Sequence, residues 1–184
     1  GDERDVDVAR AIRYAVDNGA QIVNMSFGKG FSPAKASVDS AVRYAEAKGV
    51  LLVHAAGNEG ADNDDTPSYP TPVLSGGSRA TNWIEVGASS WKPLAALPAE
   101  FSNYGRAQVD LFAPGVDILS TVPDGGLKRE SGTSMAAPVV SGVTALLMAY
   151  FPELSALQVR DIALESVRKL PDLAVRRPGD GATA

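Results

Sequence analysis

Two kinds of hydrophobic pattern alternate along the first 55 residues. Apolar residues recur at helical spacing over residues 7–18, and Gly19 supplies the stop for this predicted helix. An apolar, β-branched run over residues 21–27 predicts a buried strand. A second amphipathic helix follows, opened by Ser32 and Pro33, and the fully apolar run 50–53 predicts a second buried strand. Helix–strand repeats with continuously apolar strands are typical of a parallel sheet joined by right-handed crossovers.

The second half of the chain combines a polar segment with shorter elements. Residues 58–80 are rich in Gly, Pro, Asp and Ser and predict a long surface loop. In the segment 134–151 apolar residues occupy nearly every side, so we expect this helix in the middle of a core. Ser155 and Gln158 form a capping-box pattern at the start of the last helix. The remaining predictions are strands over residues 83–88, 109–112 and 118–122, and a last helix from 155 to about 169.

These elements predict an α/β fold with three layers, α/β/α, around a mainly parallel sheet. A length of 184 residues suits one domain, which we place at residues 1–170, with 171–184 as a disordered tail. The chain enters an amphipathic segment within a few residues of its start, as if it began inside a domain. We therefore expect the sheet to be truncated on its N-terminal side, with an exposed edge at which copies of the chain can associate.

Composition narrows the classes of function. The chain has 17 basic and 22 acidic residues and a net charge of −5, without a basic stripe for nucleic acid or an anionic membrane. No apolar run approaches the roughly 20 residues of a membrane span, and the first residues do not form a signal peptide. No cysteine and a single histidine, His54, exclude disulfide scaffolds, zinc fingers and cysteine catalysis.

Three segments carry candidate chemistry: residues 24–28, 54–60 and 131–138. The first two end buried parallel strands, where open α/β sheets place their ligands. In the third, Ser134 lies among small residues at the start of the buried helix. Free backbone N–H groups and the positive end of the helix dipole favour a developing anion at such a position. Small neighbours also let a substrate chain approach.

These three segments resemble the subtilisin-like serine proteases, the subtilases. Gly132-Thr133-Ser134-Met135-Ala136-Ala137-Pro138 is similar to the nucleophile motif of that family, and Ala55-Ala56-Gly57-Asn58-Glu59-Gly60 to its oxyanion-hole motif. Asn24-Met25-Ser26-Phe27-Gly28 resembles the strand that lines the substrate cleft. Phe101-Ser102-Asn103-Tyr104-Gly105 and Ala113-Pro114-Gly115 match further family landmarks in the expected order. The resemblance extends from about residue 8 to 170.

The resemblance implies acyl transfer at a peptide bond of a polypeptide substrate. Ser134 would be the nucleophile, and Asn58 would donate its side-chain amide to the oxyanion together with the Ser134 backbone N–H. The cleft wall and the floor of the specificity pocket come from two further sets of residues. Ser26, Phe27 and Gly28 would bind the substrate as an added strand, and Ala55, Ala56 and Gly57 would form the floor.

The catalytic aspartate and histidine of the family find no match. In subtilases both precede the segment with which this chain begins, so the chain is expected to be the C-terminal part of a catalytic domain and inactive without its N-terminal half. His54 lies in the wrong motif for a catalytic base and is better interpreted as a packed or hydrogen-bonded histidine. The family resemblance implies a secreted or periplasmic endopeptidase.

Other interpretations remain open from the sequence. One is a pseudoprotease that binds peptides without cleaving them. Another is a nucleotide-binding α/β domain, although no phosphate-binding glycine motif supports it. We assign no metal ligands and no cofactor. The three aspartates Asp62, Asp64 and Asp65 are interpreted as a solvated acidic loop, and the alternative is that they bind a structural calcium ion in the longer protein.

Overall fold

In the computed structural model, which describes residues 3–91, 97–169 and 182–183, the first half of the chain follows the predicted order. Its elements are α1 (Asp5–Asp17), β1 (Ile22–Met25), α2 (Lys35–Ala47), β2 (Leu51–Ala55) and β3 (Trp83–Ser89). The second half contains β4 (Leu111–Pro114), β5 (Ile118–Thr121), a 3₁₀ turn η2 (Pro123–Gly125), β6 (Leu127–Glu130), α3 (Thr133–Tyr150), α4 (Ala156–Glu165), β7 (Arg168–Lys169) and β8 (Ala182–Thr183).

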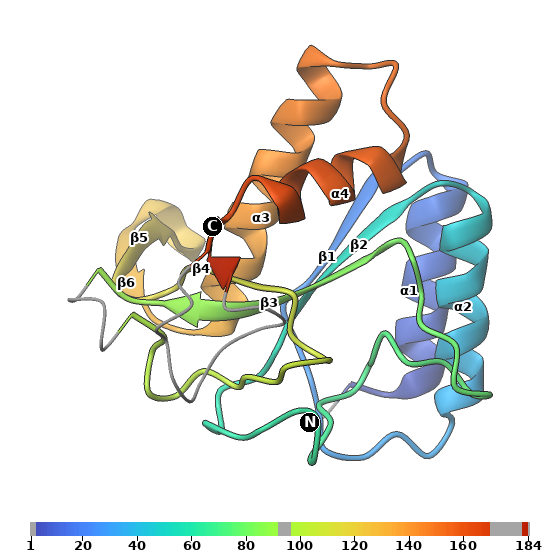
Figure 1. Cartoon of the computed structure of the whole chain (residues 1–184), viewed down its shortest axis with the longest axis horizontal. Coiled ribbons are helices and arrows are strands. Elements are labelled where there is room, and N and C mark those ends of the chain that lie inside the picture. The colour runs from blue at the N-terminus through green and yellow to red at the C-terminus, as the bar shows by residue number, and fades with distance from the viewer. Residues whose placement is uncertain (1–2, 92–96, 170–181, 184) are drawn as a thin grey trace.

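The main sheet has the strand order β1-β2-β3-β4-β8-β7, and β1 to β4 are parallel. Helices α1 and α2 cover one face, and α3 and α4 pack on the other (Figure 1). Alternate residues of β2 serve the two faces, as the pleat of a strand requires. Leu51 and Val53 pack in the core under α3 and α4, whereas Leu52 packs under α1 and α2. The predicted three-layer α/β/α architecture is thereby confirmed.

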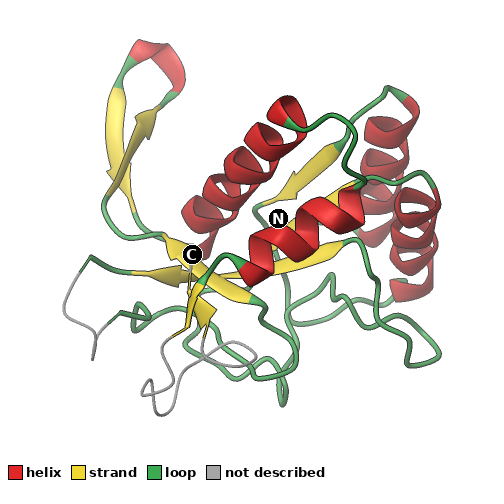
Figure 2. Cartoon of the chain, turned by 45° about the horizontal axis from the view of Figure 1, so that its top comes forward, coloured by secondary structure: helices red, strands yellow, loops and turns green. Residues whose placement is uncertain are grey.

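The strand over residues 118–121 does not join this sheet. It pairs antiparallel with β6, a strand that the sequence did not predict, and the hairpin extends away from the main body (Figure 2). The residues of β6, Leu-Lys-Arg-Glu, are exposed or half-buried, so they lack the apolar run by which the other strands were recognised. Strand β4 begins two residues later than the segment predicted for it.

The segment between β2 and β3 is a long loop, as predicted, but apolar residues anchor it. Leu74 and Ala80 are buried in the core under α1 and α2. Tyr69 pairs with Lys29 through two backbone hydrogen bonds of 3.0 and 2.8 Å, so the loop lies against the segment that follows β1. This contact brings the loop to the carboxyl end of the sheet.

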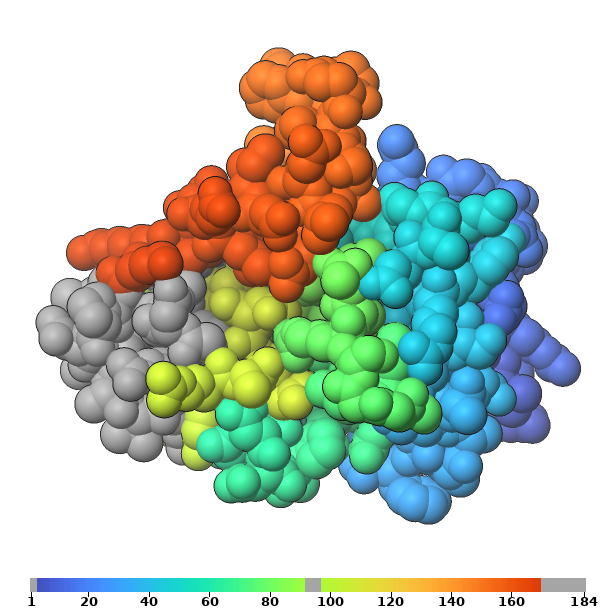
Figure 3. Space-filling model, turned by 45° about the vertical axis from the view of Figure 1, so that its right-hand side comes forward, coloured from blue at the N-terminus to red at the C-terminus, as the bar shows by residue number. Residues whose placement is uncertain are grey.

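The expectation that α3 lies in the middle of the core is wrong for this chain. Only one side of the helix is buried, and Val143, Leu146 and Tyr150 are 49%, 60% and 78% exposed. In Figure 3 the end of α3, in orange, stands clear of the rest of the molecule. Nothing within the described residues covers this side.

By length and composition α3 is also the one helix of the described part that is apolar enough to cross a membrane. The core helices of proteins without a membrane segment reach the same length and hydropathy, so these two properties do not by themselves identify a membrane-spanning helix. The predicted tail over residues 171–184 lies outside the described residues, except for Ala182–Thr183, which form β8.

Candidate active site

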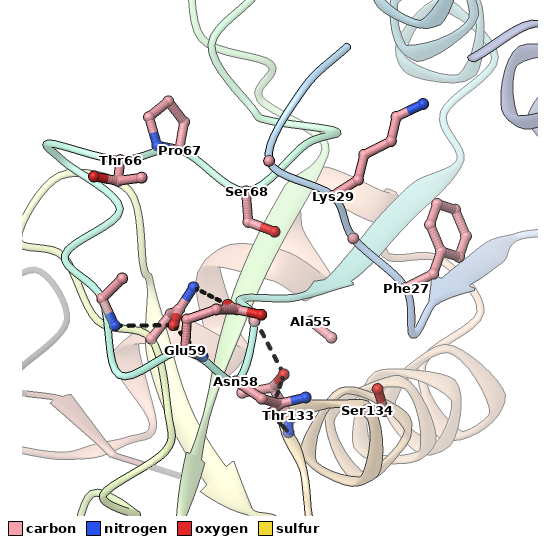
Figure 4. Close-up of a pocket in the computed structure, with 15 residues that line it drawn as sticks. Phe27, Lys29, Ala55, Asn58, Glu59, Thr66, Pro67, Ser68, Thr133 and Ser134 are labelled. Carbon is pink, nitrogen blue, oxygen red and sulfur yellow. Dashed lines mark hydrogen bonds between the residues drawn. The ribbon is translucent and has the colours of Figure 1, made fainter. Parts of the chain in front are cut away.

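Three segments meet at the carboxyl end of the sheet: the residues after β1, the residues after β2 and the first turn of α3. They surround a cavity of about 230 Å³ (Figure 4). Its lining residues are Phe27, Gly28, Lys29, Gly30, Ala55, Gly57, Asn58, Glu59, Ala61, Thr66, Pro67, Ser68, Asn103, Thr133 and Ser134. The segments that the sequence analysis singled out therefore come together in space.

Ser134 is the second residue of α3 and points toward the cavity. Its Oγ donates a hydrogen bond of 3.3 Å to the carbonyl oxygen of Ser26, and the Ser26 hydroxyl donates one of 2.9 Å to the Ser134 carbonyl. Within the described part of the chain, the Ser134 backbone N–H has no acceptor, as is usual in the first turn of a helix. Ser26 itself does not line the cavity and contributes through these two contacts.

Asn58 is anchored by one half of its side-chain amide. Its Oδ1 accepts hydrogen bonds of 2.8 Å from the Thr133 backbone N–H and 3.1 Å from the Thr133 hydroxyl. Within the described residues its Nδ2 has no acceptor. A Cβ placed on Gly132 would lie 3.6 Å from both Asn58 Nδ2 and the Ser134 backbone nitrogen. Both nitrogens thus lie beside the same point at the start of α3, and two unused donors near one point suit stabilisation of an oxyanion.

The segment Ser26–Gly28 leads from β1 along one side of the cavity. Phe27 and Gly28 line it, and a Cβ on Gly28 would lie only 2.6 Å from Ser68 Oγ, so the loop closely approaches this segment. Pairing of β1 with β2 ends at Met25, and the next backbone pairing is that of Lys29 with Tyr69.

Of the three residues predicted for the pocket floor, Ala55 and Gly57 line the cavity. Ala56 does not, because neighbouring residues of an extended chain face opposite ways. The Ala56 carbonyl instead accepts hydrogen bonds from the side-chain amides of Asn63 at 2.9 Å and Asn103 at 3.1 Å.

Asn103 organises this end of the pocket, a role that the sequence analysis did not assign. Its Oδ1 accepts the backbone N–H groups of Glu59 and Ala61, and its Nδ2 donates to the Glu59 carboxylate at 2.9 Å. The sequence signal for it was the landmark motif at residues 101–105, which indicated a relation to the family but no contact. Thr133, whose hydroxyl accepts the Gly57 N–H, was likewise missed as the anchor of Asn58.

His54 is fully buried, as the packed interpretation expects. Its Nδ1 lies 2.8 Å from Glu85 Oε1, and its Nε2 lies 2.7 Å from the Phe27 carbonyl oxygen. Complete burial raises the pKa of Glu85, and the adjacent His54 and the N–H of Trp83 offset this only in part. Since both ring nitrogens are occupied, His54 is not available as a base for Ser134.

In the acidic loop that follows β2, the carboxylates of Asp62 and Asp64 accept hydrogen bonds from backbone N–H groups. Asp64 accepts hydrogen bonds of 3.0 and 2.9 Å from Ala107 and Gln108, and Asp62 accepts the Asp64 N–H at 2.9 Å. Across the described ranges no cluster of three or more His, Cys, Asp or Glu side chains is placed to hold a metal ion. The Asp64 carboxylate thus joins the loop to residues 107–108, and the Asp62 carboxylate bonds within the loop.

Comparison with known proteins identifies the family of this chain. A sequence model of the subtilase family matches residues 1–180. Alkaline elastase YaB of Bacillus sp. (strain YaB) is 40% identical over 154 residues, which cover 84% of this chain and 36% of that protein. Subtilisin DY of Bacillus licheniformis is 35% identical over 168 residues, or 90% of this chain and 56% of its own length. The chain therefore spans only about one third to one half of these two relatives.

Solved structures show the same relation. A cold-adapted subtilisin-like serine proteinase superposes with a TM-score of 0.80 at 32% identity, over 100% of this chain and 62% of its own. The S218A mutant of the protease domain of PatA gives a TM-score of 0.77 at 36% identity, over 97% of this chain and 62% of its own.

Proposed function

Because the chain belongs to the subtilase family, we propose that it forms the C-terminal part of the catalytic domain of a serine endopeptidase. The observation that carries this proposal is that Asn58 Nδ2 and the Ser134 backbone nitrogen each lie 3.6 Å from a Cβ placed on Gly132, and that neither has an acceptor within the described residues. The longer protein would cleave peptide bonds through an acyl-enzyme on Ser134.

In this mechanism Ser134 Oγ attacks the carbonyl carbon of the scissile bond, and the carbonyl oxygen gains negative charge. These two donors would stabilise that charge, and Thr133 holds Asn58 in position by donating to Asn58 Oδ1. The proton of the serine hydroxyl needs a base. Since His54 is occupied on both nitrogens, we propose that the base and its aspartate come from a segment outside these 184 residues.

The proposed substrate is a polypeptide bound in extended form. The segment Ser26–Gly28 follows β1 beside the cleft, and a peptide would add to the free backbone groups of this segment as a further strand. Ala55 and Gly57 leave room for a side chain in the cavity of about 230 Å³. We also propose a secreted or periplasmic location for the longer protein, on the strength of its family alone.

Labelling with a fluorophosphonate, a reagent that reacts with activated serines, tests the proposal. The protein with its N-terminal segment should be labelled at Ser134 and hydrolyse peptides, and Ser134→Ala should abolish both. The 184-residue chain alone should show no turnover, because in subtilisin, the reference case, loss of the serine or the histidine lowers kcat by about 10⁶. Turnover by the isolated chain that His54→Ala removes would contradict the assignment.

A second candidate is a peptide-binding pseudoprotease. It starts from the same observation, that both nitrogens of His54, the only histidine in the sequence, are engaged, so these 184 residues supply no histidine base for Ser134. In that case the longer protein would lack an upstream aspartate and histidine, bind peptides in the cleft and remain unlabelled by the fluorophosphonate.

A further inference from the structure

His54 lies directly behind the proposed substrate-binding segment. It is the fourth residue of β2, paired in register with Met25, the last residue of β1. Its side chain extends past the end of that pairing to the Phe27 carbonyl oxygen, 2.7 Å from Nε2. The rings of His54 and Phe27 are 6.2 Å apart, nearly perpendicular. The imidazole is 0% exposed, so it does not contact a substrate itself.

The hydrogen bonds of His54 fix where its protons lie. A carbonyl oxygen only accepts, so Nε2 must carry a proton. Nδ1 faces Glu85 Oε1 at 2.8 Å, and it either donates to the carboxylate or accepts from the protonated acid. The N–H on Nε2 is present in both arrangements. Trp83 Nε1 donates to the other Glu85 oxygen at 2.7 Å and thereby fixes the carboxyl group.

We propose that His54, oriented by Glu85, is a positioning residue that holds the substrate-binding segment Ser26–Gly28 in place beside Ser134. The inference rests on the proposed function, since it assigns a role within that cleft. Its basis is the interval between two backbone pairings: β1 leaves β2 at Met25, and the chain is paired again only at Lys29. The bond from His54 to the Phe27 carbonyl ties this interval to β2 from behind.

The consequence concerns substrate binding more than the chemical step. A peptide that extends along residues 26–28 depends on the placement of this backbone, whereas a small ester contacts little beyond Ser134 and the oxyanion donors. Loss of the His54 bond should therefore raise KM for long peptides and leave the reaction of small substrates nearly unchanged.

The experiment uses the full-length protease, with active sites counted by fluorophosphonate labelling so that misfolded protein does not affect kcat. His54→Leu removes the donor in a similar volume, and we expect KM for a peptide of several residues on the acyl side to rise about tenfold. KM for a single-residue ester should change less than about twofold. His54→Gln, whose amide nitrogen replaces Nε2, should restore most of the peptide KM. If His54→Leu does not fold, His54→Asn takes its place, because its shorter side chain does not reach the Phe27 carbonyl.

Asn82→Ala is the matched control. Asn82 is buried and donates a hydrogen bond of 2.7 Å to the Val50 carbonyl at the other end of β2 and β3. Its loss should lower thermal stability without changing KM for the long peptide. An unchanged peptide KM in His54→Leu, or an equal rise for the peptide and the ester, would refute the positioning role.

Peptide binding by calorimetry in a Ser134→Ala background separates the two proposals. If His54→Leu weakens peptide binding about tenfold in this background, the positioning role is supported. Should the protein with Ser134 intact then fail to cleave peptides, only the proposed function would be refuted. If the Ser134→Ala protein with His54 intact binds no peptide, both proposals are refuted.

Discussion

At the scale of single residues, Asn58 shows how one side chain serves both the fold and the proposed chemistry. Its oxygen is used on Thr133, a residue of the neighbouring motif, and its nitrogen remains for a ligand. The sequence identified Asn58 by its motif but gave no indication of the Thr133 anchor, since the two residues are 75 positions apart. Because of this anchor, a substitution that keeps the oxygen and removes only the nitrogen tests the oxyanion role of Asn58 more directly than alanine does.

Asn58→Asp should keep the anchor and lose the donor. The aspartate can still accept from the Thr133 N–H and hydroxyl, but it has no N–H and adds a negative charge near the developing oxyanion. In the full-length protease we expect kcat to fall by at least about 10², with KM changed little, because the donor acts mainly in the transition state. Steady-state kinetics with active-site titration measure both quantities.

Asn58→Ala provides the comparison, because it removes the acceptor as well. Its melting temperature should fall below that of Asn58→Asp, while kcat is lowered in both. If Asn58→Asp kept the wild-type kcat, or raised KM alone, Asn58 would be a substrate-binding or turn residue and the oxyanion assignment would fail.

At the scale of secondary structure, the strands with continuous apolar runs could be predicted from the sequence, and so could the capping box of α4. Ser155 Oγ accepts the Gln158 N–H at 3.3 Å, and Gln158 Oε1 accepts the Ser155 N–H at 3.0 Å. Strand β6 was missed because its residues contact solvent rather than a core. The exposed side of α3 was missed because composition reports which residues are apolar, not what covers them.

The residues of the candidate site also fall into two groups, those that the sequence could predict and those that it could not. Ser134, Asn58 and Gly57 lie in local motifs that open a helix or follow a strand, so their positions could be predicted. Asn103 contacts Glu59 and Glu85 contacts His54 over separations of 44 and 31 positions, which no local pattern encodes. A polar residue inside an apolar strand, such as Glu85 in β3, is nevertheless a signal, because burial demands a partner for it.

The start of α1 contains an acidic pair that allows a test of pH dependence. Asp5 is buried and accepts hydrogen bonds from the Ser32 hydroxyl and the Ala34 N–H, and Lys29 Nζ lies 2.7 Å from its Oδ1. Burial alone would raise the pKa of Asp5, but the bonds from Lys29, Ala34 and Ser32 outweigh it and lower the pKa below its ordinary value. The ionised form therefore stabilises the fold, and this contribution is lost as the pH falls.

Asp5→Asn should lower the free energy of unfolding by about 2 kcal/mol at pH 7. The substitution removes a buried, hydrogen-bonded negative charge and leaves the positive charge of Lys29 without it. The difference from wild type should shrink below about pH 4, where the wild-type carboxylate begins to protonate. Urea unfolding at several pH values between 2 and 7 measures it.

Asp7 is the matched control, because it lies in the same first turn but is exposed, with ion pairs of 3.8 and 3.9 Å to Arg4 and Arg10. Asp7→Asn should change the free energy of unfolding by less than about 1 kcal/mol. Equal effects of the two substitutions at pH 7 would show that the Asp5 cluster contributes no more than a surface charge.

At the scale of the whole molecule, two surfaces of the described structure lack a covering element. Strand β1 is the outer strand of the main sheet and presents unpaired backbone groups on one side. The exposed side of α3 carries Leu146 and Tyr150. The relatives are longer than this chain, which covers 36% of alkaline elastase YaB and 56% of subtilisin DY. We therefore propose that an upstream segment covers the exposed side of α3 and pairs with β1.

Without that segment, the 184-residue chain should associate with itself. Exposed apolar area and an open sheet edge both favour contacts between copies, so the weight-average mass in analytical ultracentrifugation should rise with protein concentration. Leu146→Lys places a charge on the exposed side of α3 and should shift the association to higher concentration.

Phe31→Lys is the control, because Phe31 is 74% exposed in the segment between β1 and α2 and belongs to neither surface. In the protein that includes the upstream segment, the mass should be independent of concentration, and hydrogen exchange should show protected amides along β1. A chain that stays monomeric, or a Phe31→Lys effect equal to that of Leu146→Lys, would show that these two surfaces do not drive association.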